Sequence, residues 1–368
     1  MAHTYISGIA SHFAFEGVLT ATQELTAGNV NVTYLVTYTE DSVEHQYIIQ
    51  RINTAAFHDP VSLMDNVGKV TSHIKASYEK EGISTERRVL SFVPCDNGTL
   101  LYTDDEGGAW RAYHYIDGVT AYNSIENPSQ FYEAGYGFGE FQTRLADFPA
   151  DELVETIPGF HDTAKRYEAF LTAVAEDTAG RVASLGEEIA FFKDRKDLAH
   201  AIVSQLGSDD VPLRVTHNDT KLNNVLMDNE TGKALCVIDL DTVMPGSALY
   251  DYGDAVRYGA CTTAEDEPNT SKIGFDMTLF EAFTKGFVEA TNGRLTKTEI
   301  QMLPVGVAVI TYELAMRFLT DYINGDVYFK TFYEGHNLVR ARAQMKLLTE
   351  IEKHWNDMNA FIEALIGN

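Results

Sequence analysis

The sequence is poor in cysteine and in positive charge, and both deficits exclude classes of protein. Its 368 residues include only three cysteines, Cys95, Cys236 and Cys261, which form no CxxC or other metal-ligand spacing. An odd number of distant cysteines argues against a disulfide framework and predicts buried thiols in a reducing cytoplasm. The 28 basic residues face 54 acidic ones, which gives a formal net charge of −26. A charge of this sign repels nucleic-acid backbones and anionic lipids, so neither nucleic acid nor membrane is an expected partner.

The sequence also lacks a segment that we expect to direct secretion or to cross a membrane. The first residues, MAHTYISGIASHF, contain neither a basic stretch nor an apolar one, so no secretory signal is expected. The most apolar stretch, residues 302–319, is interrupted by Pro304 and Gly306 and carries Glu313 and Arg317. We expect it to form a buried core helix of a cytoplasmic protein.

The length and composition are typical of two folded lobes. Hydrophobic residues make up 45% and aromatic residues 11% of the chain, which is the composition of a globular protein. At roughly 150 residues per domain, a chain of 368 residues is long enough for two lobes with separate cores. No repeat or long linker separates the halves, so a short hinge is expected. Nothing in the sequence indicates an oligomer, and a monomer is compatible with it.

Short β-rich runs dominate the first third of the chain. They lie at residues 30–38, 46–52, 99–103 and 109–116 and alternate with turn signals, which predicts an antiparallel sheet. Residues 60–75 between them carry apolar side chains at helical spacing. We therefore expect a β-rich N-lobe over residues 1–117.

Long helices are expected after Gly118, in a C-lobe over residues 118–368. Asn127 and Pro128 are a typical N-cap and first-turn pair, and aromatic and small side chains follow at helical spacing. A second helix is predicted from about Glu187 to Leu206, where Gly207 would end it. The last quarter of the chain also has a helical pattern.

One segment interrupts this helical region and carries the candidate chemistry. It contains the spacing HxDxxxxN, with His217, Asp219 and Asn224, and an Ile-Asp pair that ends at Asp239. Short apolar runs flank the polar loop, and a turn around residues 231–232 joins two of them, so the polar residues lie at predicted strand ends. This spacing matches the catalytic loop and the metal-binding strand of kinase-like phosphotransferases.

The residue types in this segment suit phosphoryl transfer. One carboxylate must accept or orient the proton of an attacking hydroxyl, and oxygen ligands must hold Mg²⁺ against the triphosphate. Asp219 fits the first role, and Asn224 and Asp239 fit the second. His217 is expected to pack the loop. The alternative is a hairpin loop whose Asp and Asn residues only form turns, but four spaced elements favour the catalytic interpretation.

The motifs HNDTKLNN and VIDLDTVMPGSALYDYGDAVR, with the β-rich N-lobe, resemble the aminoglycoside phosphotransferase and choline kinase superfamily. Longer stretches, from GIASHFAFEG to HNLVRARAQMKLL, are similar to N-acetylhexosamine 1-kinases and cover almost the whole chain. The resemblance implies an α+β, protein-kinase-like bilobal fold. It also implies transfer from ATP, with Mg²⁺, to the C1 hydroxyl of a neutral amino sugar. A kinase of another small alcohol and an inactive nucleotide-binding module remain the alternatives.

On the nucleotide side, the resemblance places a phosphate-covering loop at residues 26–31, with Gly28 at its turn and Asn31 at its end. Kinase-like folds usually carry a lysine on the third strand, and none is present here. Gln50 or Arg51 must then serve, and Arg51 is preferred for its charge. Strand alternation puts the two on opposite faces, which leaves the choice open. Backbone groups of the expected hinge would hold the adenine edge: Tyr115, Ile116 and Asp117.

The phosphoryl acceptor is expected between Asp219 and the C-terminal helices. Arg317 stands in an otherwise apolar segment, and a buried arginine is costly unless it is paired. It therefore serves either an ion pair, with Asp321 or Asp241, or the substrate, and the resemblance favours sugar binding. The acidic run at residues 265–267 is expected to be a solvated loop. The resemblance adds Asn29 and Tyr328 to the sugar site. Asp241, two residues after Asp239, is expected either to assist the metal or to bind a sugar hydroxyl.

Overall fold

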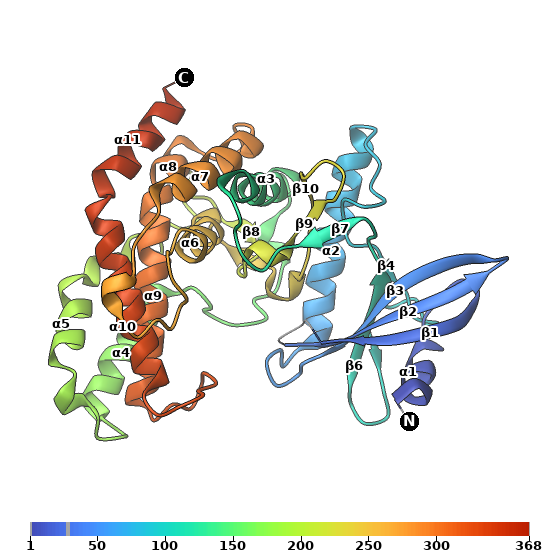
Figure 1. Ribbon diagram of the computed structural model, residues 1–368, viewed down its shortest axis with the longest axis horizontal. Helices are drawn as coiled ribbons and strands as arrows, with labels where there is room; N and C mark the ends of the chain where they lie inside the picture. Colours follow the sequence, from blue (N-terminus) through green and yellow to red (C-terminus); the bar gives the residue numbers. More distant parts are fainter. Residues whose placement is uncertain (1, 27–29, 368) are drawn as a thin grey trace. The chain divides into compact units, whose positions relative to one another are not determined.

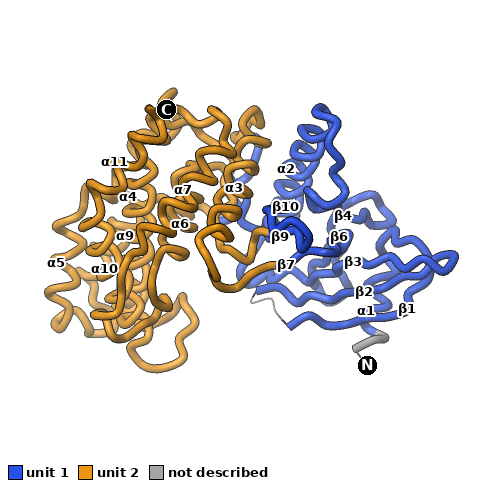
Figure 2. The backbone as a smooth tube through the Cα atoms, turned by 45° about the horizontal axis from the view of Figure 1, so that its top comes forward, with its two compact units in different colours: residues 1–120, 152–157, 226–244 blue, residues 121–151, 158–225, 245–368 orange. Residues whose placement is uncertain are grey.

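The chain folds into two compact units in the computed structural model, which describes residues 2–26 and 30–367 (Figures 1 and 2). Unit 1 comprises residues 1–120, 152–157 and 226–244, and unit 2 comprises residues 121–151, 158–225 and 245–368. The lobe boundary at residues 117 and 118 stays a prediction. By packing, unit 1 also takes in two segments from later in the chain, because a hairpin after the catalytic loop bonds to the segment around Gly118.

A six-stranded sheet forms the centre of unit 1, in the order β1-β2-β3-β6-β4, with β5 also paired to β6. Its pairs are antiparallel, as predicted. Asp41 and Ser42, which join β2 to β3, have φ values of 48° and 70°. Two such residues in a row form the turn that suits a twisted hairpin. The strands are β1 (Val18–Leu25), β2 (Val32–Glu40), β3 (Val43–Ile52), β4 (Phe92–Val93), β5 (Tyr102–Thr103) and β6 (Ala109–His114).

Helices α1 (Ala2–Ala10) and α2 (Pro60–Lys80) contact opposite faces of this sheet. Ile6 of α1 packs in one buried cluster with Tyr47 and Trp110. Side chains alternate along a strand, so Arg111 of β6 points to the other face, where its Nη1 lies 3.8 Å from the sulfur of Met64 in α2. The sheet therefore has an apolar aromatic face and a face that carries a buried charge.

Helix α2 confirms the prediction for residues 60–75 and continues to Lys80. It begins where the Asp59 side chain accepts a hydrogen bond from the Ser62 amide at 3.0 Å, with Pro60 in the first turn. Helix α1 and strand β1 were not predicted.

The remaining strands of unit 1 form a small sheet in the order β10-β9-β7. The predicted turn around residues 231–232 joins β9 to β10. The Asp228 carboxylate accepts the Thr231 amide at 2.9 Å, and Gly232 has a φ of 68°. The bounds are β7 (Val119–Ala121), β9 (Val225–Asp228) and β10 (Ala234–Val237).

Unit 2 consists mainly of helices, as predicted for the second part of the chain. Helix α3 begins as expected, because the Asn127 side chain accepts the Gln130 amide at 3.0 Å and Pro128 lies in the first turn. Strand β8 (Arg214–Thr216) pairs with β11 (Met244–Gly246). The helices are α3 (Pro128–Arg144), α4 (Thr163–Glu176), α5 (Gly186–Asp194), α6 (Ala248–Gly259), α7 (Met277–Thr291), α8 (Lys297–Gln301), α9 (Leu303–Ile323), α10 (His336–Lys353) and α11 (Trp355–Ile366).

The predicted helix over residues 187–206 was wrong in its second half. Helix α5 ends at Asp194, and a short 3₁₀ segment covers residues 196–200. The Arg195 guanidinium forms two bonds of 2.7 and 2.9 Å to the Glu352 carboxylate, and lies over the Phe191 ring. These tertiary contacts accompany the change from α-helical bonding to tighter turns. Ala199 and Ile202, in the part of the segment that is not α-helical, are nevertheless fully buried.

Helix α9 contains the apolar stretch that was predicted to be a core helix. Within the described residues, it is the one helix long and apolar enough to cross a membrane, and 78% of its most apolar window is buried inside the protein. Burial of this kind is typical of a core helix. The cysteines agree in part with expectation, since Cys95 and Cys236 are buried and Cys261 is half-buried.

Candidate active site

The segment with the HxDxxxxN spacing forms a loop that is fixed by one buried carboxylate in unit 2. Asp251 of α6 accepts the backbone amides of His217 at 2.8 Å and Asn218 at 2.7 Å. Its backbone oxygen accepts the Thr220 hydroxyl at 2.6 Å. Burial raises the pKa of Asp251, and these hydrogen bonds together with the nearby His217 oppose that rise. The loop is therefore held by backbone contacts on its inner side, which leaves Asp219 half-exposed.

Asp219 meets two of its loop neighbours directly. The Asn224 side-chain amide donates to the Asp219 carboxylate at 3.1 Å and to its backbone oxygen at 2.7 Å. The Lys221 ammonium lies 2.6 Å from the other carboxylate oxygen. Asn224 is buried, so its amide is held in one orientation. The structure thus brings together Asp219 and Asn224, as the spacing predicted.

His217 packs the loop, as expected. Its ring is fully buried, and it lies edge-on to Phe138 at 5.6 Å and Phe141 at 5.9 Å between ring centres. Its Nδ1 accepts the Asp219 amide at 3.2 Å. This histidine therefore helps to orient the loop.

In unit 1, Asp239 follows β10 and has φ and ψ values of 59° and 57°. A residue other than glycine in this left-handed region carries strain, and such strain is concentrated at functional sites. Asp239 is exposed, while Leu240 and Asp241 in the following 3₁₀ turn are buried. The chain therefore turns its Asp239 carboxylate outward at the position that the motif assigns to a metal ligand.

Asp241 lies in a different environment from the one expected of a sugar ligand. It is 3% exposed and forms a buried ion pair with Arg111 of β6. Its second oxygen accepts a hydrogen bond from the side-chain amide of Asn31 at 2.7 Å. Burial alone would lower the pKa of Arg111, but the charge of Asp241 raises it above its ordinary value. Both oxygens of Asp241 are thus engaged within unit 1, because strand β6 brings an arginine to this position.

The structure also separates the two candidates for the missing strand lysine. Gln50 lies on the face of Arg111 and accepts the Arg111 Nε–H at 3.0 Å. Arg51 lies on the other face, with its guanidinium 5.8 Å from the centre of the Trp110 ring. The structure therefore does not bring Arg51 together with Asp241, and Gln50 is the candidate that lies on the same side of the sheet as Arg111.

The expected hinge residues follow β6. The Tyr115 amide donates to Gln46 at 3.0 Å, and the Asp117 and Gly118 carbonyls accept the Arg87 guanidinium at 3.2 and 3.1 Å. Ile116 is buried, and among the described residues its amide and carbonyl have no hydrogen-bond partner. These two groups match the donor and acceptor that an adenine edge needs. The expected loop residues Gly28 and Asn29 lie outside the described residues.

Arg317, the expected sugar contact, lies in a small pocket of unit 2. The pocket has a volume of about 190 Å³, and Arg317 and Tyr328 both line it. The Arg317 guanidinium lies 5.8 Å from the centre of the Tyr328 ring, and its Nη1 is 3.5 Å from the Glu313 carboxylate. Asp321 does not pair with it, because its oxygens accept the amides of residues 327–329. The partner that sequence reasoning missed is thus Glu313, one helical turn earlier on the same face.

A larger cavity of about 690 Å³ lies elsewhere in unit 2, beside Leu222 of the catalytic loop. Glu265 and Asp266 line it, which corrects the expectation that this acidic run is only a solvated loop. Glu265 bonds to Arg257 at 3.0 Å, and Arg257 also bonds to Asp254 at 2.7 Å. Glu265 and Asp266 belong to the loop that follows α6, and this loop forms part of the cavity wall.

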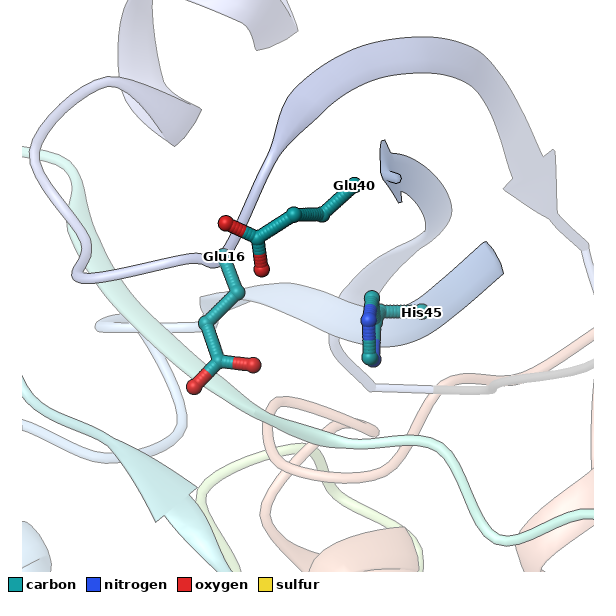
Figure 3. A group of neighbouring side chains, drawn as sticks. All are labelled: Glu16, Glu40 and His45. Atoms are coloured by element: carbon teal, nitrogen blue, oxygen red, sulfur yellow. The ribbon is translucent and has the colours of Figure 1, made fainter. Parts of the chain in front are cut away.

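A further group of ligand-type side chains lies in unit 1, near the turn of the β2–β3 hairpin (Figure 3). Glu16, Glu40 and His45 come from three segments, and one ligand atom of each lies within 4.8 Å of the others. Both glutamates are exposed. Exposed acidic groups are common without an ion, so we assign no role to this group.

Comparison with solved structures defines the class of fold. An aminoglycoside phosphotransferase from Alicyclobacillus acidocaldarius has a TM-score of 0.62 and 11% identity, over 97% of this chain and 96% of that one. A choline kinase from Cryptosporidium parvum has a TM-score of 0.55 and 13% identity, over 98% of this chain and 99% of that one. A spectinomycin phosphotransferase, solved with ADP and spectinomycin, has a TM-score of 0.55 and 14% identity, over 95% of this chain and 96% of that one. The fold is protein-kinase-like, with a β-sheet N-terminal region and a helical C-terminal region, as expected.

Residues 22–275 match the model of the phosphotransferase enzyme family, and this range is more than half of the chain. The chain belongs to that family. It is therefore a kinase-like phosphotransferase of the aminoglycoside phosphotransferase and choline kinase type, which confirms the superfamily expected from the sequence.

Proposed function

We propose that the protein is an ATP- and Mg²⁺-dependent kinase that phosphorylates the C1 hydroxyl of an N-acetylhexosamine. The products are the sugar 1-phosphate and ADP. One observation carries the proposal: Asp219 is half-exposed on a loop that Asp251 fixes from the buried side, in a chain of the phosphotransferase family. The proposed location is the cytoplasm.

In this proposal Asp219 orients the acceptor hydroxyl and receives its proton. Lys221, 2.6 Å from Asp219, holds that carboxylate in its orientation. Phosphoryl transfer of this kind needs little covalent help from the protein, so positioning is the main contribution of these side chains.

Asn224 and Asp239 are the residues that would hold Mg²⁺, which supplies positive charge to the phosphates when bound. The donor set fits a hard cation. The Asn224 nitrogen is used toward Asp219, which leaves its amide oxygen as the ligand, and Asp239 presents an exposed carboxylate. The assignment rests on these side chains and on the motif spacing.

The acceptor would be bound by Arg317 and Tyr328, whose pocket of about 190 Å³ is the right order of size for one sugar ring. Guanidinium and phenol groups can donate to the hydroxyl and acetamido oxygens of a neutral sugar. Tyr328 is 66% exposed, so an aromatic surface is available to the apolar face of a ring. For Asn29 and Gly28 the proposed contacts with sugar and phosphate rest on the resemblance alone.

Replacing Asp219 by Asn tests the mechanism. We expect Asp219→Asn to lower kcat by at least about a thousandfold, because it removes the proton acceptor and keeps the size of the side chain. Asp210→Asn, a change of an exposed acid, is the matched control and keeps full activity. The measurement is ADP release with N-acetylglucosamine. Full turnover by Asp219→Asn would exclude the proposed role.

A second candidate function is the phosphorylation of an amine-bearing alcohol. The cavity beside Leu222 favours it, because the acids in its lining outnumber the arginines and would attract a cation. The acids are Glu265, Asp266 and Asp276, and the arginines are Arg257 and Arg340. Glu265→Gln with Asp266→Asn would then raise the KM for choline or kanamycin and leave the KM for N-acetylglucosamine unchanged. Loss of activity on N-acetylglucosamine alone would contradict this second function.

A further inference from the structure

Unit 1 buries a charged side chain, Arg111, that none of the roles above uses. Its residue is 3% exposed, and it lies on β6 directly opposite Gln50 of β3. Taking a guanidinium out of water costs several kcal/mol unless it is paired and hydrogen-bonded. A position of this kind needs a specific set of partners.

The hydrogen-bonded network around Arg111 connects four separate segments, and Met64 of α2 lies beside it. The guanidinium Nε donates to Gln50 at 3.0 Å, and Nη1 pairs with Asp241 and approaches Met64 of α2. The other Asp241 oxygen accepts the Asn31 amide at 2.7 Å. The network therefore runs from β3 and β6 to the turn after β10 and to the beginning of β2.

This network holds the backbone turn that presents Asp239. Asp241 belongs to the 3₁₀ turn at residues 240–242, and Asp239 precedes that turn in a left-handed conformation. A strained residue persists only when its surroundings fix it. Both oxygens of Asp241 are fixed by Arg111 and Asn31, so the strained Asp239 is anchored two residues away.

We infer that Arg111 is a positioning residue that, with Gln50 as its hydrogen-bond acceptor, holds Asp241 and so the orientation of Asp239. The inference rests on the proposed function of Asp239 as a metal ligand. The buried cation on this face of the sheet belongs to β6, and Gln50 on the neighbouring strand accepts its hydrogen bond. In this inference Arg111 acts through Asp241.

The test is the Mg²⁺ dependence of ATP binding, measured by calorimetry on the full chain without any acceptor. Loss of a residue that orients a metal ligand typically costs about 10- to 100-fold in metal affinity. We expect Arg111→Met to raise the Mg²⁺ concentration for half-maximal tight ATP binding by about tenfold. Arg111→Lys should recover part of this loss, because an ammonium can pair with Asp241 but cannot also serve Gln50 in the same fork.

Two controls separate positioning from a general loss of stability. Arg195→Met removes an arginine from a two-bond ion pair with Glu352 in unit 2 and should leave the Mg²⁺ dependence unchanged. Asp241→Asn should raise the Mg²⁺ requirement as Arg111→Met does, and the double variant should be no worse than either single one. Folding of each variant is checked by urea denaturation.

The outcomes distinguish this inference from the proposed function. A folded Arg111→Met with unchanged Mg²⁺ dependence overturns the inference, whichever acceptor the enzyme uses. If Arg111→Met does not fold, Arg111→Lys decides by the same titration. Absence of ADP release from the wild type with every sugar would overturn the proposed function, and the binding titration would still decide on Arg111.

Discussion

Asp251 shows how one residue sets the geometry of another that is expected to react. Its carboxylate accepts the two amides of residues 217 and 218 and also the Gln142 side chain at 3.1 Å. Asn218, whose amide donates one of these two hydrogen bonds, has a φ of 65°. The strained backbone next to Asp219 is therefore maintained by one buried acid.

Replacing Asp251 by Asn should weaken this loop. An amide has one acceptor oxygen, so at least one buried N–H would lose its partner, at a cost of about 1–3 kcal/mol. We expect lower stability to urea and faster hydrogen exchange at residues 217 and 218, with a lower kcat. Unchanged exchange at these amides in Asp251→Asn would contradict the bracing role.

Glu313 provides a pH-dependent prediction at the same scale. Burial alone would raise the pKa of Glu313, but His161 and Arg317 lower it below its ordinary value of 4.5. A lowered pKa in the folded state means that its contribution to stability is complete above pH 4.5 and is lost as pH falls through the folded value. Glu313→Gln should therefore cost about 3 kcal/mol near pH 7 and less below pH 4. Urea unfolding at several pH values measures this, and a cost that does not change with pH would contradict it.

At the scale of elements, helices α3 and α7 approach each other through glycine (Figure 1). A Cβ atom on Gly135 would lie 2.2 Å from the Phe283 backbone oxygen, and one on Gly286 would lie 2.1 Å from that of Tyr132. Neither contact is possible without moving backbone. Gly135, which the sequence placed on the inner face of α3, is therefore a point of close packing.

Gly135→Ala should destabilise the protein by about 3 kcal/mol or more, because the helices must move apart. Gly8→Ala is the matched control, since its added Cβ meets nothing within 4 Å and alanine is the better helix former. We expect that control to be neutral or stabilising by up to about 1 kcal/mol. Chemical denaturation measures both, and equal effects would show that the close approach is not responsible.

Elements with local signals were the ones that the sequence predicted well. The caps at Asp59 and Asn127 start α2 and α3 at the predicted residues, and the turn at residues 231–232 is present. The prediction of one helix over residues 187–206 was wrong. The helix ends just before Arg195, whose partner Glu352 lies far along the chain, so local periodicity does not reveal this contact. The choice between Gln50 and Arg51 was open for the same reason, since only the strand pairing shows that Arg111 lies opposite Gln50.

At the scale of the whole molecule, a net charge of −26 opposes the binding of ATP, so positive charge must be supplied locally. Within the described residues of unit 1, Arg111 is buried against Asp241 and Arg51 lies against Trp110. We expect Mg²⁺ to supply much of the charge that the phosphates need. ATP affinity should fall at least about tenfold when EDTA removes Mg²⁺, and metal-independent binding of equal strength would contradict this expectation.

The sequence predicted the candidate site best where residues of one short motif lie together, and least well where residues from distant segments contact each other. Asp219 and Asn224 were found from spacing alone, and they are hydrogen-bonded to each other. The sequence also predicted that Asp251 braces the catalytic loop, and its bonds to the amides of residues 217 and 218 confirm this. The pairing of Arg111 with Asp241 joins distant segments, which local periodicity does not reveal.

The identity of the phosphoryl acceptor tests the proposed function most directly. ADP release should be measured with a panel of N-acetylglucosamine, N-acetylgalactosamine, other hexoses, choline and kanamycin, and the product should be examined by ³¹P NMR. We predict ADP release with the N-acetylhexosamines and a phosphorus signal coupled to the anomeric proton. Turnover of choline or kanamycin alone, or a phosphate on C6 of the sugar, would contradict the proposed function.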